Sequence, residues 1–116
     1  MVRKTELVSG MADWTARRIA GDAASWKQYL DTASRLYKYS FDDQLLIYAQ
    51  RPEATACASM ELWNNRMRRW VKGGSKGIAL IRHKEGGKPY LDYVFDVADT
   101  RPVQGARMPY LWRMGE

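Results

Sequence analysis

A helical repeat of apolar side chains is the feature that most constrains the fold of this chain. Between residues 26 and 37, apolar residues recur at steps of three or four positions. They are Trp26, Tyr29, Leu30, Ala33, Leu36 and Tyr37. This spacing places them along one side of an α-helix of about three and a half turns, with charged residues on the other side. We therefore expect an amphipathic helix here.

Other helices are predicted on both sides of it. Residues 1–10 have no clear period and are expected to be a frayed lead-in, followed by a short helix over 14–19 that Gly21 interrupts. Ser40 is typical of a helix N-cap, and the helix it begins should end at Arg51, which precedes a proline. Ser59 is a second expected N-cap, before a helix over 60–67.

The second half of the chain favours strands. Residues 54–58 are small and predict a short buried strand, and 78–81 are apolar and β-branched. Gly86 and Gly87 predict a hairpin turn before a return strand over 90–97. We expect an α+β fold with about three helices on a small, mainly antiparallel sheet that ends in a β-hairpin. The 116 residues suffice for a single domain, with a core over about 14–100 and 101–116 as a tail or a linker to a missing C-terminal region.

Composition excludes several classes of protein. The longest runs without a polar side chain, such as 45–49, have five residues, whereas a membrane span needs about 20. No apolar segment of a secretory signal follows the basic start. The single cysteine, Cys57, and the single histidine, His83, exclude a disulfide and most zinc sites. We expect a cytoplasmic protein with no metal, no cofactor and no membrane partner.

The positive charge is concentrated in the middle of the chain. Of 19 Lys and Arg and 13 Asp and Glu, residues 51–88 hold nine basic and three acidic side chains, which makes +6. Residues 1–50 carry +1 and residues 89–116 carry −1. A clustered excess favours a polyanion such as nucleic acid more than an even distribution does, although a solvated basic face without a partner has the same composition.

The sharpest local pattern in this basic region is three arginines around one tryptophan. Arg66, Arg68 and Arg69 flank Trp70, and a glycine-rich loop between Lys72 and Lys76 follows. In a nucleic-acid site the cations would contact phosphates and the indole would stack on a base. The alternative is that Trp70 fills the core while the arginines point to solvent.

Catalytic readings have weaker support. Asp92 and Asp96 would share one face of a strand, as an acid pair or a Mg²⁺ site requires, but we prefer the explanation that they lie at a solvent-facing strand edge and a turn. His83 is expected in an exposed loop and Cys57 in a buried position. The glycine loop lacks the spacing of a P-loop and stands between a helix and a strand in the wrong order for a dinucleotide fingerprint. We therefore expect a binding domain rather than an enzyme.

Four segments together resemble the N-terminal domain of ArdC-type antirestriction proteins. They are YKYSFDDQLLIYAQRP (37–52), the alanine-rich strand that follows it together with the helix that contains Trp63, VKGGSKGI (71–78), and VFDV with Asp99 and Thr100. The resemblance covers about residues 26–100. It implies a single-stranded DNA-binding domain of a plasmid, phage or conjugative-transposon protein with a role in antirestriction or DNA transfer. The metallopeptidase part of such proteins, with its HExxH motif, is not in this sequence.

One position departs from this family pattern. Asp43 stands where the family usually has asparagine. A carboxylate would repel a phosphate but would serve as well as an amide in capping a helix, and we expect the capping role.

These observations lead us to expect sequence-tolerant binding of single-stranded DNA. The expected contact residues are Lys38, Tyr39, Gln44, Arg51, Arg66, Arg68, Arg69, Trp70, Lys72 and Lys76. Tyr39 and Trp70 are the expected stacking residues, and Gln44 the expected contact to a base edge or phosphate. The alternative is a protein-interaction module whose basic face docks on an acidic partner or on another domain of a larger parent protein. The oligomeric state is left open.

Overall fold

The computed structural model describes residues 4–103 and has four α-helices and two small antiparallel sheets. The helices are α1 (Lys4–Ala20), α2 (Ala23–Arg35), α3 (Phe41–Gln50) and α4 (Met60–Asn65). The strands are β1 (Cys57–Ala58), β2 (Arg69–Val71), β3 (Ile78–His83), β4 (Pro89–Asp96) and β5 (Thr100–Pro102), with the 3₁₀ turn η1 (Val97–Asp99) between β4 and β5. The predicted α+β class is confirmed.

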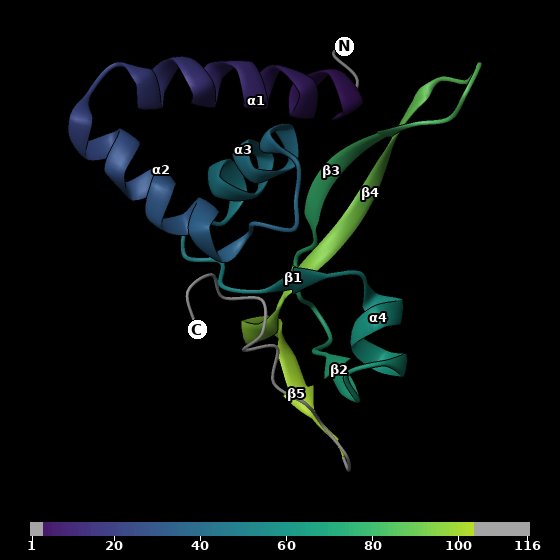
Figure 1. Ribbon diagram of the computed structural model, residues 1–116. Coiled ribbons are helices and arrows are strands. Elements are labelled where there is room, and N and C mark those ends of the chain that lie inside the picture. Colours follow the sequence, from purple (N-terminus) through teal and green to yellow (C-terminus); the bar gives the residue numbers. More distant parts are fainter. Residues whose placement is uncertain (1–3, 104–116) are drawn as a thin grey trace.

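The two sheets lie in different parts of the molecule (Figure 1). The first has the order β1-β4-β3, and α1 and α3 pack against it, with α2 against both helices. The second consists of β2 and β5 alone and packs with α4 at the opposite end from α1. We call this pair of strands the ribbon. No described helix is both long and apolar enough to cross a membrane.

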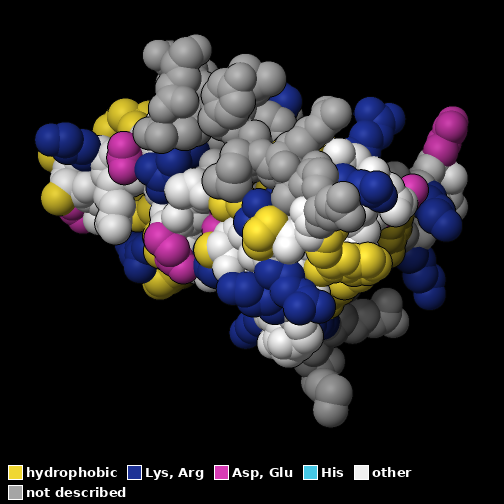
Figure 2. Space-filling view, turned by 90° about the horizontal axis from the view of Figure 1, so that it is seen from below, with side chains coloured by type: hydrophobic (Ala, Val, Ile, Leu, Met, Phe, Trp, Pro, Cys, Tyr) yellow, Lys and Arg dark blue, Asp and Glu magenta, His cyan; other side chains and the backbone are white. Residues whose placement is uncertain are grey.

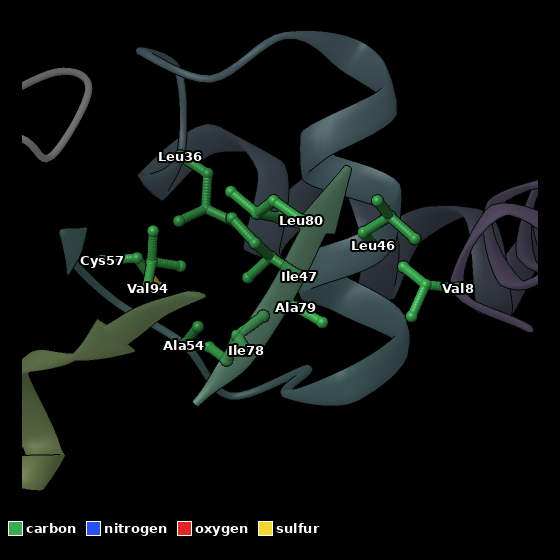
Figure 3. Packing of buried hydrophobic residues seen from close by; sticks show 10 residues of the cluster. All are labelled: Val8, Leu36, Leu46, Ile47, Ala54, Cys57, Ile78, Ala79, Leu80 and Val94. Atoms are coloured by element: carbon green, nitrogen blue, oxygen red, sulfur yellow. The ribbon is translucent and has the colours of Figure 1, made fainter. Parts of the chain in front are cut away.

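The main core lies between α1, α3 and the first sheet. Ile47 of α3 and Leu80 of β3 are fully buried and meet in this core, as Figure 3 shows. Val8 extends the core to α1, and Val94 extends it to β4. The Gln50 side chain fastens α3 to β3, because it donates to the Ala79 carbonyl at 2.9 Å and accepts from the Ala79 N–H at 2.8 Å.

The predicted helix caps are confirmed. The Ser40 hydroxyl accepts from the Asp43 N–H, and the Ser59 hydroxyl accepts from the Leu62 N–H. The Asp43 side chain, however, is not a cap as expected. Its two oxygens accept hydrogen bonds from Nη1 of Arg82 at 2.9 and 3.2 Å, so the carboxylate holds the start of α3 to strand β3.

Two sequence expectations about the helices were wrong. The first helix begins at Lys4, not near Trp14. Its buried side consists of Val8, Thr15 and Ile19, and because one of these is a threonine, the apolar pattern of the sequence does not reveal the helix. Only part of the apolar stripe on α2 is buried, since Tyr29 is buried whereas Trp26 is 44% exposed. The main packing partners of α2 are the helices α1 and α3, and part of its apolar side faces solvent.

The C-terminal boundary expected for the core also shifts. Arg101 and Pro102 belong to strand β5, although the tail was expected to begin at 101. The remainder of that segment, 104–116, lies outside the described residues. The turn between β3 and β4 matches the prediction, with Gly86 at a positive φ of 70° that favours glycine.

Asp96 was expected to face solvent at a strand edge. Instead it is buried and only 2% exposed. Its carboxylate accepts backbone N–H groups from Thr55 at 2.8 Å, Ala56 at 3.0 Å and Ala98 at 3.1 Å. Asp92 is partly exposed, and its carboxylate lies 3.7 Å from the Arg82 guanidinium. Within residues 4–103 no three acidic, histidine or cysteine side chains gather into a metal site. Asp96 is therefore a structural anchor.

This role predicts a large difference between the two aspartates. Asp96→Ala leaves three backbone N–H groups without their acceptor, at a cost of about 1–3 kcal/mol for each one that stays buried. We expect a loss of about 3 kcal/mol or more in the free energy of unfolding by urea titration. Asp92→Ala is the matched control on the same strand and should lose less than about 1 kcal/mol. Equal losses would contradict the anchor role.

Candidate nucleic-acid interface

The outer face of the ribbon presents a tryptophan opposite an arginine. Trp70 of β2 pairs with Arg101 of β5 in the antiparallel register. Side chains of directly paired residues lie on the same side of a sheet, so the indole and the guanidinium are neighbours. Trp70 is 49% exposed. The expected alternative, in which Trp70 fills the core, is therefore wrong.

More cations flank this pair. Arg68 and Lys72 lie two residues to either side of Trp70, and both side chains are exposed. Arg66, the C-cap of α4, is exposed as well. Figure 2 views the molecule from the ribbon end and shows dark-blue Lys and Arg side chains gathered beside yellow apolar ones. We call Arg66, Arg68, Trp70, Lys72 and Arg101 the ribbon face.

Arg68 has an unusual backbone. Its φ is 54°, the left-handed region that costs a non-glycine residue about 1–2 kcal/mol. The ladder of the ribbon holds it there, since its carbonyl accepts from the Val103 N–H at 3.0 Å. Strained residues of this kind cluster at functional sites, where the strained conformation places a side chain that takes part in the function.

The inner side of the ribbon is fixed to the domain. The Arg69 Nε donates to the Thr100 hydroxyl at 2.8 Å, and Val71 packs on the cluster around Trp63. Trp63 itself is fully buried and donates from its ring nitrogen to the Phe95 carbonyl at 2.8 Å. Arg69 was predicted to contact a phosphate. In the structure its side chain links the two strands of the ribbon through the hydrogen bond to Thr100.

Two predicted contact residues are engaged inside the fold. The Gln44 amide nitrogen donates to the Leu36 and Tyr39 carbonyls at 3.1 and 3.2 Å, and its oxygen accepts from the Tyr29 hydroxyl at 3.1 Å. Gln44 therefore closes the turn between α2 and α3. Tyr39 packs on the main core and donates to the Cys57 carbonyl at 2.7 Å, and burial raises the pKa of its hydroxyl. Neither residue belongs to the ribbon face, and the hydrogen-bonding groups of both side chains have partners inside the protein.

Arg51 is engaged as well. Its Nη1 and Nη2 donate to the Asp99 carboxylate at 2.6 and 3.2 Å, and its Nε donates to Glu53 at 2.8 Å. The hydrogen bonds to Asp99 raise the pKa of the guanidinium further. This pair ties the end of α3 to η1, and so to the start of β5. Its positive charge is largely compensated within the protein.

The other two predicted lysines lie at separate hollows. Lys76 lines a groove of about 420 Å³ beside α1, with Leu7 and Tyr93. Lys38 lines a smaller apolar pocket near the start of α4. The structure therefore brings together Arg66, Arg68, Trp70 and Lys72, but not the whole predicted set.

Arg101 is the cation beside Trp70 that the sequence did not indicate. Strand β5 has three residues and contains a proline, so its sequence carries almost no strand signal. Only the pairing with β2 places Arg101 beside Trp70. Cys57 is buried as expected. His83 is exposed as expected, but it is the last residue of strand β3 and does not lie in a loop. Burial raises the pKa of the Cys57 thiol, so it stays protonated and unreactive.

A comparison of the chain with models of protein families, with curated proteins and with solved structures finds no match in any of the three.

The hydrogen bonds of Gln44 predict a structural effect. Gln44→Ala leaves two turn carbonyls and the Tyr29 hydroxyl without this partner, and we expect about 2 kcal/mol less stability in urea unfolding. Gln28→Ala removes an exposed amide that makes one hydrogen bond, to the Tyr48 hydroxyl, and should cost less than about 1 kcal/mol. A Gln44 variant that keeps full stability but loses DNA binding would return Gln44 to the contact set.

Proposed function

We propose that this chain binds single-stranded DNA, with little preference for sequence, through the ribbon face. The observation that carries the proposal is Trp70, half exposed and surrounded by Arg68, Lys72 and Arg101. An exposed indole offers a flat surface for a base, and the cations neutralise the phosphates on either side. None of these groups has to distinguish one base from another.

A single strand fits this face better than a duplex. An indole on the surface stacks on a base only when that base is unpaired and unstacked. A two-stranded ribbon can enter the major groove of a duplex, but this one has only three residues per strand and is short for that role. The strained backbone at Arg68 supports the same assignment, since it holds a cation next to the stacking residue.

The resemblance to the ArdC-type N-terminal domain supports the same function. It rests on the four sequence segments, and one of them, residues 71–78, begins in strand β2 of the ribbon. We propose, on this basis, a role in a mobile-element protein, in antirestriction or DNA transfer. The binding itself requires no catalysis.

The alternative is a protein-interaction module in which the ribbon face docks on an acidic segment of a partner. Polyglutamate tests it directly, because it supplies negative charge but no base to stack. If polyglutamate competes as well as a DNA strand of equal charge, the protein-interaction reading is favoured. If DNA competes at least about tenfold better, base stacking is needed and the DNA reading stands.

The first functional prediction concerns the indole. Trp70→Ala should weaken binding of a labelled 20-mer single strand by about tenfold, since base stacking on an aromatic residue contributes about 1–3 kcal/mol. Trp14→Ala is the matched control, because Trp14 is 59% exposed on α1 and also has an arginine, Arg18, over its ring. Fluorescence anisotropy measures both. Equal affinities of the two variants would contradict the role of Trp70.

The second functional prediction separates binding from stability at Arg68. Arg68→Gly removes a cation and relieves the left-handed backbone, so we expect about 0.5–1 kcal/mol more stability. The same variant should bind single-stranded DNA more weakly, with a log–log salt dependence less steep by about 0.7. Urea unfolding and anisotropy at several salt concentrations measure the two effects. Unchanged affinity and slope would remove Arg68 from the interface.

A further inference from the structure

A small apolar pocket lies between the end of α2 and the start of α4. Its volume is about 220 Å³. Its walls come from residues far apart in the chain: Leu36, Tyr39, Cys57, Ala58, Ser59 and Leu62. Arg35 and Lys38 line it as well, and no acidic residue does, although the Arg35 guanidinium pairs with Asp31 beside the pocket at 3.1 Å. An apolar interior with only positive charges among its lining groups suits a ligand that has a flat apolar part and a negative part.

The pocket is preformed. Leu36, Cys57 and Ala58 are buried parts of the packed core, so the floor does not depend on a ligand. The Tyr39 ring is held in place because its hydroxyl donates to the Cys57 carbonyl at 2.7 Å. The Arg35 Nε donates to the Ala54 carbonyl at 2.9 Å, which fixes the stem of this cation beside the pocket.

The pocket is connected to the ribbon through α4. Ser59, the N-cap of α4, lines the pocket, and Arg66, the C-cap of the same six-residue helix, belongs to the ribbon face, so the two ends of this helix are about 10 Å apart. Figure 1 places β1, α4 and the ribbon in the same end of the molecule. A strand held on the ribbon face is therefore bound close to the pocket.

We propose that this pocket receives one unstacked nucleobase of the DNA strand bound on the ribbon face. The base would lie against the Tyr39 ring and the side chain of Leu62, and Lys38, which also lines the pocket, would contact the adjacent phosphate. The Ser59 oxygen already accepts from the Leu62 N–H, so its hydroxyl proton is available to a base edge. This inference rests on the proposed function and adds a second base-binding position to it.

The size of the pocket supports this occupant. Pockets for drug-sized ligands have volumes of about 300–1,000 Å³, so a hollow of about 220 Å³ suits a single ring system. A peptide helix would need a longer groove with several anchor positions. Bases taken out of a stack are commonly held between an aromatic ring and apolar side chains, which is the lining found here.

The test separates the pocket from the ribbon by means of an eight-nucleotide thymidine strand and the same strand without bases. In the wild-type protein we expect the complete strand to bind about tenfold or more tightly than the abasic one, because stacking needs bases. In Trp70→Ala the indole is gone, and a preference of at least about threefold should remain if the pocket holds a base. Adding Leu62→Trp, which fills the pocket, should abolish that remainder.

Leu30→Trp is the matched control for the filled pocket, because Leu30 is exposed on α2 and does not line it. Added to Trp70→Ala, it should leave the remaining preference unchanged. If Leu62→Trp alters the circular dichroism spectrum, Leu62→Phe makes a smaller addition at the same position. Thymidine monophosphate, followed through the methyl resonances of Leu36 and Ala58, tests the free nucleotide as an occupant.

Each outcome decides between the two proposals. If Trp70→Ala alone removes the whole preference for bases, the pocket proposal is overturned while DNA binding by the ribbon stands. If the wild-type protein binds neither strand, the proposed function itself fails. If thymidine monophosphate alone binds as tightly as the strand, the pocket is a free-nucleotide site and our assignment to a strand base is wrong.

Discussion

The buried carboxylate of Asp96 connects the two parts of this molecule. It ends strand β4, accepts the backbone N–H groups of Thr55 and Ala56 before β1, and caps η1 through Ala98. Three backbone donors on one ionised carboxylate form strong, charge-assisted hydrogen bonds. Because η1 leads directly into β5, the direction in which the ribbon leaves the main sheet depends on this one side chain.

The ribbon depends on such anchors because it is too small to be stable by itself. Two strands of three residues form few ladder bonds, and isolated hairpins are at best marginally stable in water. The buried Trp63 supports one side of the ribbon, and the Arg51–Asp99 pair holds the chain that enters β5. The outer side is left to the cations and Trp70. The contacts that stabilise the ribbon and the face proposed to bind DNA thus lie on opposite sides of the same two strands.

The features that the sequence predicts correctly are those set by residues close together in the chain. The caps at Ser40 and Ser59 follow from a serine just before an apolar run, and the β3–β4 hairpin follows from two glycines between apolar strands. Helix α1 was largely missed because its buried side includes Thr15, and the half-exposed stripe of α2 was missed because periodicity does not say how many neighbours a helix has. Arg101 was missed since only a pairing across about 30 residues brings it to Trp70.

The distribution of charge explains why some residues predicted to contact DNA are paired within the protein while others are exposed. Of the basic excess in residues 51–88, Arg51 and Arg82 are compensated by Asp99 and Asp43, which a count of charges along the chain does not reveal. What remains near the ribbon is a row of cations spaced around one aromatic ring. Such a row neutralises a backbone of regularly spaced phosphates whatever bases it carries. A second base position next to it would therefore add affinity without adding a sequence requirement, as long as the pocket offers mainly apolar contact.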